Sequence, residues 1–365
     1  MKKQLKSYSI KEFAFVPPPY GGVSTYVKRL IERMNDLGIV TGGYFLSNCH
    51  DKNIIMSDLY DEWKWMPTHL FFFRIFKYIF ETRKYKVIHS HFSLEGMLYL
   101  WFLKLFCRKK IVITVHNSMV GDYVEKTNFI NRYFLKKLAS SSKVTWIAVS
   151  DQVKDSMLNL PLTFASEINI VPAYIPPRRN AISNLSEELQ LYIKSYEKII
   201  VFYGHSFMSY LSQDVYGFQT ALRMYSSLTT DEQKRYGLVY CIANSSEKEL
   251  LELKSVAESL GILDKIYWQI GAIENMVDLW EQTDVYIRPT CTDGDSVAVR
   301  EALDMGTQVV ASDVSFRPDN VIKYPFGDDE RFVDAVRLAI SKDKESMNID
   351  DSHFIMMLNI YKSIL

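Results

Sequence analysis

Two series of short β-rich runs, each alternating with helical segments, constrain the fold of this 365-residue chain most strongly. The first series predicts strands over residues 9–16, 40–46, 87–90, 111–115 and 144–149. The second predicts strands over residues 199–203, 238–242, 266–269, 285–287 and 309–311. Between these runs apolar residues recur at helical spacing, as in residues 23–37. Strands that alternate with helices form doubly wound parallel sheets, so the sequence predicts an α/β chain.

A proline-rich segment, residues 171–179, separates the two series. A chain of this length exceeds one hydrophobic core and is typical of two domains of about 150–200 residues each. The predicted boundaries are residues 1–178 for the N-terminal domain, 179–196 for a linker and 197–347 for the C-terminal domain. Residues 348–365 are predicted as a helix that crosses back to the N-terminal domain. We expect the two Rossmann-like domains to face each other across a cleft that binds ligands.

Cysteine and histidine spacing predicts no metal site. The four cysteines, Cys49, Cys107, Cys241 and Cys291, are far apart and form no C-x-x-C pair, which is typical of reduced packing residues in a cytosolic protein. His89 and His91 alternate as strand residues do, without a second group of ligands nearby in the sequence. We therefore expect neither a metal nor another cofactor.

Charge is distributed unevenly along the chain. Residues 1–180 hold 26 Lys and Arg against 14 Asp and Glu, whereas the remainder holds 17 against 29. Residues 70–80 and 98–106 combine large apolar side chains with cations, and each is followed by a basic cluster. This pattern predicts peripheral attachment to the anionic inner face of the cell membrane, although ordinary core helices with solvated basic ends would give the same pattern. No nucleic-acid partner, signal peptide or bilayer-spanning segment is expected.

A strand-to-helix junction carries the strongest chemical signal. Residues 284–289 read as a strand ended by proline, and residues 297–305 have helical spacing before Gly306. The amides of Ser296, Val297 and Ala298 would then lie at a helix N-terminus, where anions bind well. Glu301 could reach back to hydroxyls beside such an anion. The alternative is structural, with Ser296 as a helix cap, Asp293 and Asp295 as turn formers and Glu301 as a solvated side chain.

Several motifs in one order make the chain resemble the retaining glycosyltransferases of family 4, which have the GT-B fold. The motifs are Pro-Tyr-Gly-Gly-Val at residues 19–23, Val-Ile-His-Ser-His at 87–91, Thr-Val-His-Asn at 114–117, the runs at 147–150 and 168–172, Gly271, Leu279-Trp280, the strand at 284–289, and Asp293 with Glu301 eight residues later.

The resemblance implies roles for these residues. Glu301 would hold the ribose hydroxyls of the nucleotide, Asp293 the hydroxyls of the donor sugar, and the amides around Ser296, Val297 and Ala298 the diphosphate. The remaining implied site residues are Gly21 and Gly22 for the diphosphate, Gly271 for the base, His116 for the transferred sugar, and His91 and Asn117 on the acceptor side.

The chain departs from the family pattern where cations normally neutralise the diphosphate. Gly204-His205 stands where the family has Gly-Arg, and residues 214–217 contain no lysine before their glycine. We expect Arg288 or Arg300 to replace these charges, or His205 if it is protonated. Asp293 is also one methylene shorter than the family's glutamate, so Asp295 could share its contact.

The predicted activity is transfer of a hexose or N-acetylhexosamine from a nucleotide-diphosphate sugar, UDP in the first instance. The acceptor would be a glycan or a polyprenyl-linked saccharide in bacterial surface-polysaccharide biosynthesis, that is, capsule, O-antigen (lipopolysaccharide) or exopolysaccharide. The missing cations leave open a non-catalytic GT-B subunit that supports a partner enzyme. A dinucleotide-dependent oxidoreductase is disfavoured because no G-x-G-x-x-G follows the first strand.

Overall fold

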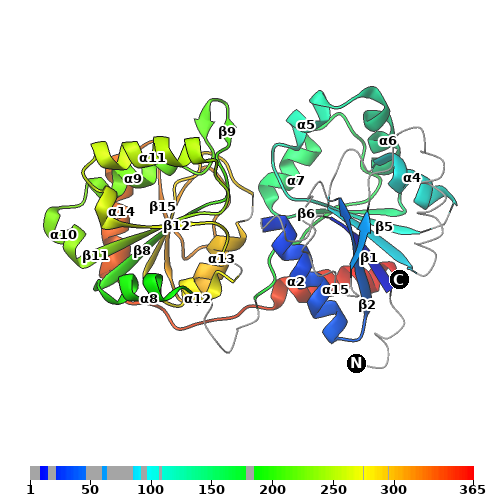
Figure 1. Cartoon of the computed structure of the whole chain (residues 1–365). Coiled ribbons are helices and arrows are strands. Elements are labelled where there is room, and N and C mark those ends of the chain that lie inside the picture. Colours follow the sequence, from blue (N-terminus) through cyan, green and yellow to red (C-terminus); the bar gives the residue numbers. More distant parts are fainter. Residues whose placement is uncertain are drawn as a thin grey trace. The chain divides into compact units, whose positions relative to one another are not determined.

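The computed structural model describes residues 9–14, 22–46, 60–63, 85–91, 97–106, 109–177, 185–273, 275–294 and 296–365. It divides the chain into two compact units. Unit 1 comprises Met1–Ile175 and Asp351–Leu365, and unit 2 comprises Pro176–Asp350. Each unit is a Rossmann-like α/β domain with helices beside a parallel sheet (Figure 1).

The sheet of unit 1 has seven parallel strands in the order β3-β2-β1-β4-β5-β6-β7. Their bounds are β1 Ser9–Phe13, β2 Val40–Leu46, β3 Tyr60–Trp63, β4 Val87–His91, β5 Lys110–Val115, β6 Val144–Ala148 and β7 Ile168–Ile170. The strand order reverses direction between β1 and β4. In open α/β sheets ligands bind at the carboxyl ends of the strands at such a switch point.

The helices of unit 1 are α2 Gly22–Asp36, α4 Met97–Phe106, α5 Val120–Lys126, α6 Phe129–Ala139, α7 Asp151–Leu158 and α15 Ser352–Ile364. α15 comes from the end of the chain but packs in this unit. Its Phe354, Met357, Leu358 and Tyr361 recur at helical spacing and are buried in the core around β1, β4 and β5. Arg33 of α2 forms an ion pair with Asp351 just before α15.

The main sheet of unit 2 has six parallel strands in the order β12-β11-β8-β13-β14-β15. Their bounds are β8 Lys198–Gly204, β11 Tyr236–Ile242, β12 Ile266–Ile270, β13 Val285–Arg288, β14 Gln308–Ser312 and β15 Ile322–Tyr324. Alternate residues pack on opposite faces, so Ile200 and Phe202 belong to one core and Ile199 and Val201 to the other. An antiparallel hairpin of β9 Ser209–Tyr210 and β10 Gln213–Asp214 follows β8.

Helices cover both faces of this sheet (Figure 1). They are α8 Glu187–Lys194, α9 Phe218–Ser226, α10 Thr230–Arg235, α11 Glu247–Ser259, a 3-10 turn at Leu263–Lys265, α12 Val277–Trp280, α13 Val297–Asp304 and α14 Asp329–Ser341. Helix α8 lies inside the range predicted as a linker. Ser186 caps it, and Leu189 and Ile193 are buried in unit 2, so this part of the range is a packed element and not a connection.

The ten predicted strands all form, with ends that differ by a few residues, and β2 has the predicted bounds. Strands β3, β7 and β15, of three or four residues each, were not predicted as strands because so short a run carries little periodicity. The predicted amphipathic segment at residues 70–80 lies outside the described residues. Among those that are described, no helix has both the length and the apolar character needed to cross a bilayer.

Candidate active-site residues

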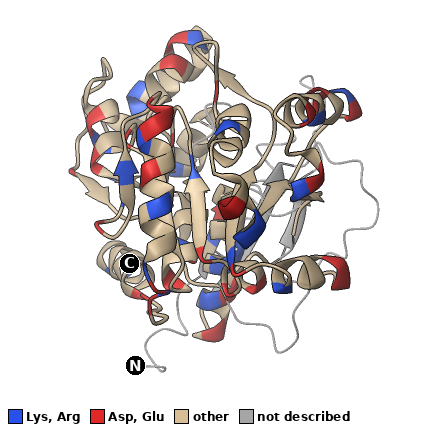
Figure 2. Cartoon of the chain, turned by 90° about the vertical axis from the view of Figure 1, so that its left-hand side faces the viewer, with Lys and Arg blue, Asp and Glu red and all other residues tan. Residues whose placement is uncertain are grey.

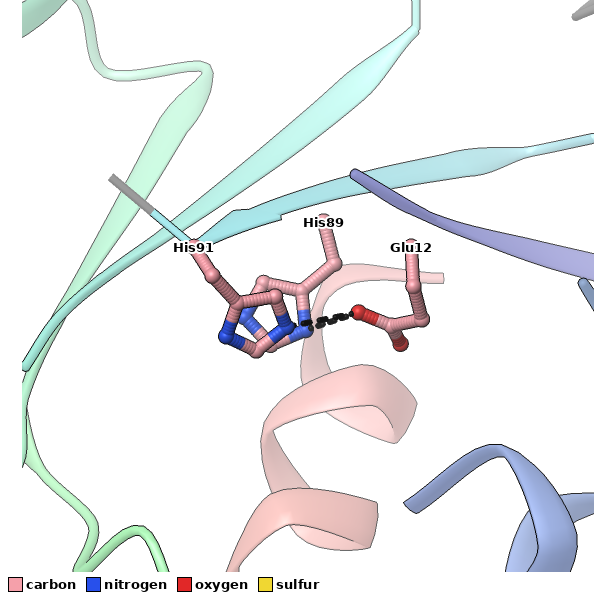
Figure 3. Close-up of side chains that lie close together, drawn as sticks. All are labelled: Glu12, His89 and His91. Carbon is pink, nitrogen blue, oxygen red and sulfur yellow. Dashed lines mark hydrogen bonds and ion pairs between the residues drawn. The ribbon is translucent and has the colours of Figure 1, made fainter. Parts of the chain in front are cut away.

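A buried cluster of one carboxylate and two imidazoles occupies the switch point of unit 1. Glu12 on β1 is opposite His89 of the neighbouring parallel strand β4, and His91 follows two residues later on the same face. All three side chains are buried. Figure 3 shows the carboxylate of Glu12 directed at both rings.

Further side chains complete this cluster as a hydrogen-bonded network. Glu12 Oε2 lies 3.0 Å from His91 Nε2 and 3.0 Å from His89 Nδ1, and the Tyr361 hydroxyl lies 2.9 Å from Glu12 Oε1. His89 Nδ1 is also 2.6 Å from the Tyr361 hydroxyl, and its Nε2 is 2.8 Å from the Thr114 hydroxyl. The network therefore joins β1, β4, β5 and α15.

Burial and neighbouring groups set the charge state of the network. Burial alone would raise the pKa of the Glu12 carboxyl, but the adjacent His89 and His91 lower that pKa to about 2, so Glu12 is ionised. Burial, and after it the neighbouring His89, lowers the pKa of His91 to about 4. Burial beside His91 likewise holds the pKa of His116 well below its ordinary value. His91 and His116 are therefore neutral at neutral pH.

Glu12, His89 and His91 have the donor atoms of a metal site, all within 4.8 Å of one another. Both imidazole nitrogens are, however, at hydrogen-bonding distance from the same carboxylate oxygen. Hydroxyls of Tyr361 and Thr114 and the ring of His116 hydrogen-bond to the other polar atoms of the cluster. The cluster is thus satisfied by its own protons, which is the arrangement expected of a buried polar network.

The predicted sugar-contacting histidine is attached to this network. His116 directly follows β5 and is half-buried, and its Nε2 lies 2.8 Å from His91 Nδ1. Asn117, predicted on the acceptor side, is engaged locally because its Oδ1 accepts a hydrogen bond from the amide of Met119 at 2.8 Å. Gly22 is the exposed first residue of α2, whereas Gly21 lies outside the described residues.

In unit 2 the structure pairs residues to which the sequence analysis gave separate roles. Arg288, at the end of β13, donates to both oxygens of Asp293 over 3.0 and 3.2 Å. Arg317, in the loop after β14, donates to Asp293 Oδ2 at 2.8 Å and to the Thr290 hydroxyl at 3.0 Å. Asp293 is therefore the centre of an Arg288–Asp293–Arg317 triad.

The triad holds one net positive charge in a buried place. Burial would raise the pKa of Asp293, but the two guanidinium groups lower it to about 2. The guanidinium of Arg288 also lies 5.1 Å from the centre of the Tyr216 ring. Arg317 was not predicted as a site residue, and the only local signal was a lone arginine before Pro318 at the end of a strand.

The helix that follows the triad begins as predicted, at Ser296. Ser296 Oγ accepts from the amide of Val299 at 3.4 Å, and Val297 and Ala298 form the half-buried first turn. Glu301 is not the solvated side chain of the structural alternative, because it is only 4% exposed and accepts a hydrogen bond from Trp280 Nε1 at 3.1 Å. Arg300 is half-buried beside it, and Asp295 lies outside the described residues.

The structure also shows what stands where the family carries its two cations. Asp214 accepts hydrogen bonds from the amides of Tyr216 and Phe218 and so caps α9, in the region where the family carries its lysine. Gly217 follows with a φ of +73°, and a Cβ there would come within 2.3 Å of the Pro289 carbonyl oxygen. Burial lowers the pKa of His205, so its ring is neutral at neutral pH and does not supply the expected cation.

A hollow of about 420 Å³ lies at the carboxyl ends of β8, β11 and β12. Its lining is part polar and part apolar and includes Ser206, Asn244, Ser246 and Ile270. Gly271 has a φ of +95° and open space where a side chain would stand. His205 borders this region through a contact of 3.4 Å between its Nε2 and Asn244, and its buried Nδ1 has no hydrogen-bond partner among the residues that the structure describes.

Comparison with known proteins agrees with this architecture. Residues 20–179 match the family described as Glycosyltransferase Family 4. No curated protein matches the sequence at a significant level.

Solved structures share the fold over nearly the whole chain. Sucrose-phosphate synthase from Thermosynechococcus elongatus is 15% identical, with a TM-score of 0.71 over 98% of this chain and 99% of that chain. HepE of Anabaena in complex with UDP and glucose is 12% identical, with a TM-score of 0.73 over 98% and 100%. The lipopolysaccharide outer core galactosyltransferase WaaB in its apo form is 15% identical, with a TM-score of 0.64 over 98% and 100%.

At this level of identity the solved structures show the fold alone, while the family match covers most of unit 1. Residues 20–179 match Glycosyltransferase Family 4, and the chain is a glycosyltransferase of the GT-B fold.

Proposed function

We propose that this glycosyltransferase transfers a hexose or N-acetylhexosamine, with retention of configuration, from a UDP-sugar. The acceptor is a hydroxyl of a glycan or polyprenyl-linked saccharide in the biosynthesis of a bacterial surface polysaccharide. Transfer needs no metal, and unit 2 binds the donor. The protein works in the cytoplasm on the inner face of the cell membrane.

The observation that carries this proposal is the net positive triad before α13. Arg317 has a side chain that is 1% exposed and Arg288 one that is 9% exposed, while a single carboxylate is shared between them. A buried net charge is costly unless an opposite charge lies close to it. A diphosphate beside the first turn of α13 supplies that charge and also meets free amides at the helix N-terminus. The triad thus replaces the family's two cations.

The hollow at the ends of β8, β11 and β12 is suited to the nucleoside. Its volume of about 420 Å³ falls within the usual range for small-molecule sites. Polar groups line it, and the unsatisfied Nδ1 of His205 is nearby for a further hydrogen bond. HepE, which shares the fold, has been solved with UDP and glucose, and this supports the choice of a UDP-sugar.

A second surface, on α6 of unit 1, supports membrane attachment. The exposed side of α6 carries Phe129, Ile130 and Tyr133 together with Arg132, Lys136 and Lys137, and α6 contains no acidic residue. Helix α4 packs on α6 and adds exposed Leu105 and Phe106. On the helices of unit 2, by contrast, acidic and basic residues are interspersed (Figure 2).

Cations on this surface lie close enough to one another to lower the pKa of one of them. After burial, the charges of Lys143 and Lys137 lower the pKa of Lys104, so these three ammonium groups lie close together. An anionic lipid surface relieves such repulsion, and each cation near it contributes about 1 kcal/mol. Exposed aromatic side chains between the cations are suited to the bilayer interface. WaaB, a neighbour in fold, is a lipopolysaccharide outer core galactosyltransferase, which supports a membrane-linked saccharide as acceptor.

Turnover of a panel of nucleotide sugars tests which donor the enzyme uses. Binding of UDP to variants of the triad tests where the diphosphate lies. We expect Arg288→Gln, which removes a charge, and Arg317→Lys, which keeps the charge but loses the planar guanidinium, each to weaken binding of UDP at least about fivefold. Arg223→Gln is the matched control, because Arg223 is also an ion-paired arginine of unit 2 but lies exposed on α9. If the two triad variants bind UDP like the control, the triad is structural and the diphosphate lies elsewhere.

Vesicle flotation tests the membrane half. The protein should float with anionic vesicles, and less so in high salt or when Arg132, Lys136 and Lys137 are changed to glutamine. The control changes three exposed lysines of unit 2, Lys234, Lys248 and Lys323, to glutamine. Binding that ignores both lipid charge and the α6 substitutions would favour a water-soluble acceptor.

A further inference from the structure

We propose that Glu12, through His91, fixes the hydrogen-bonding polarity of His116, so that His116 presents an unprotonated Nδ1 that accepts a hydrogen bond from a hydroxyl of the sugar substrate. Glu12 and His91 are positioning residues in this proposal, and His116 is the group that contacts substrate. The inference rests on the proposed function for the identity of the ligand, but the polarity follows from unit 1 alone.

Glu12 sets the direction of the hydrogen bonds in this series, because its carboxylate is surrounded by hydrogen-bond donors. His91 Nε2 and His89 Nδ1 face its Oε2, each at 3.0 Å, and the Tyr361 hydroxyl lies 2.9 Å from its Oε1. An ionised carboxylate has no proton to donate and can only accept. His91 Nε2 must therefore carry a hydrogen, because a bare nitrogen at that distance would place two lone pairs against each other.

The tautomer of His91 in turn fixes the direction of its hydrogen bond to His116. A neutral imidazole has one protonated and one bare nitrogen, so a hydrogen on Nε2 leaves His91 Nδ1 as an acceptor. The atom 2.8 Å from it is His116 Nε2, which must in turn donate. The ring of Tyr26 packs edge-on against both imidazoles, with centroids 5.8 Å apart in each case, and helps to hold their orientation.

His116 is left with a bare Nδ1. Among the described residues only His91 is hydrogen-bonded to His116, which is half-buried at the carboxyl end of β5. Such a nitrogen accepts from a hydroxyl and does not bind a carbonyl, carboxylate or phosphate oxygen, since none of these has a hydrogen to donate. The network therefore selects a hydroxyl-bearing ligand at this position.

The primary test needs no variant. Nitrogen-15 NMR of histidine-labelled wild-type protein distinguishes protonated from bare ring nitrogens, and the His116 signals are assigned by their loss in His116→Gln. We expect His116 to carry its hydrogen on Nε2. A hydrogen on Nδ1 would overturn the proposal, as would a tightly bound metal ion, found by elemental analysis, that leaves His91 Nε2 without a proton.

Two variants show whether Glu12 sets the tautomer of His116 or only stabilises the network. Glu12→Met keeps the length of the side chain but removes the acceptor, so we expect both tautomers of His116 to be populated. Tyr361→Phe removes a hydroxyl from the same carboxylate and leaves the Glu12–His91–His116 series intact, so its His116 signals should match the wild type. Tautomers that do not respond to Glu12→Met would contradict the role given to Glu12.

Kinetics with fluorinated donor sugars link the polarity to the substrate. Fluorine cannot donate a hydrogen bond, so replacing the relevant hydroxyl should lower kcat/KM of the wild type about tenfold, and clearly less in Glu12→Met. An equal loss in both enzymes would mean that His116 does not accept a hydrogen bond from that hydroxyl. If no nucleotide sugar turns over at all, the proposed function fails while the tautomer result stands, so the two failures are distinguishable.

Discussion

At the scale of single residues, the buried carboxylates of the two units are held by hydrogen-bond donors that the structure identifies. Glu301 illustrates the consequence for function, because one of its oxygens already accepts from the indole of Trp280. The same carboxylate can therefore serve a ribose hydroxyl only with its remaining lone pairs. Its structural and functional contributions are separable by the choice of substitution.

We predict that Glu301→Gln folds normally but loses at least about tenfold in transfer, because the amide oxygen can still accept from Trp280 while the charge is gone. Glu301→Ala should in addition lose roughly 1–3 kcal/mol of stability, since it leaves the indole N–H unpaired. Urea unfolding and initial transfer rates measure the two effects. A fully active Glu301→Gln enzyme would exclude Glu301 from donor binding.

The histidines of unit 1 predict an acid-labile fold. The pKa of His91 is about 4 in the folded chain against an ordinary 6.5, so the unfolded chain binds more protons between these values. This stability is present above pH 6.5 and is lost as the pH falls toward 4. His91→Asn should flatten the dependence in that window by about 1.4 kcal/mol per pH unit and leave the dependence above pH 6.5 unchanged. Urea unfolding at a series of pH values measures it, and an unaltered slope would contradict the neutral state of His91.

Sequence patterns identified some of these residues and missed others for a physical reason. His91, His116 and Glu301 were found because they stand in local motifs at strand ends and on a helix. Glu12 was missed because nothing near it in the sequence shows that β1 pairs with β4 in a register that places it opposite His89. Arg317 was missed likewise, since 24 residues separate it from Asp293 in the sequence and helix α13 and strand β14 lie between them.

At the scale of elements, apolar periodicity was sufficient for the long strands and helices but not for the β9–β10 hairpin. Its turn residues, Leu211 and Ser212, have φ values of 48° and 63°. Residues other than glycine and asparagine adopt this backbone conformation only at a cost in free energy. Leu211 is 79% exposed, so packing does not compensate for that cost. Neither residue type predicts such a turn from sequence.

We predict that replacing Leu211-Ser212 by Asn-Gly stabilises unit 2 by about 1–2 kcal/mol, because these residues favour the turn conformation already present. Thermal unfolding measures the change. Leu251→Asn serves as control, since it also removes an exposed leucine but lies in helix α11 and should not stabilise the protein. A loss of stability in the turn variant would mean that Leu211 makes a contact the fold depends on.

At the scale of the whole molecule, the chain is not divided simply into a first and a second half. The last fifteen residues belong to unit 1, where α15 contributes four buried side chains to the core and the Tyr361 hydroxyl to Glu12. The sequence analysis predicted a C-terminal helix that crosses back to the first domain. Its apolar spacing alone does not say which core it enters.

We predict that a chain ending at Asp350 loses the stability of unit 1 while unit 2 remains folded. Exposing Phe354, Met357, Leu358 and Tyr361 forfeits about 1.5–3 kcal/mol for each side chain, a sum comparable with the whole stability of a typical domain. Calorimetry should show the unit 1 transition lowered or absent, and UDP binding, which we assign to unit 2, should persist. Substitution of the exposed Ile355 and Met356 by glutamine in the full-length chain is the control and should change neither transition. If the shortened chain keeps both transitions, α15 is an appendage of unit 1, and the Glu12 network does not need Tyr361 to hold its shape.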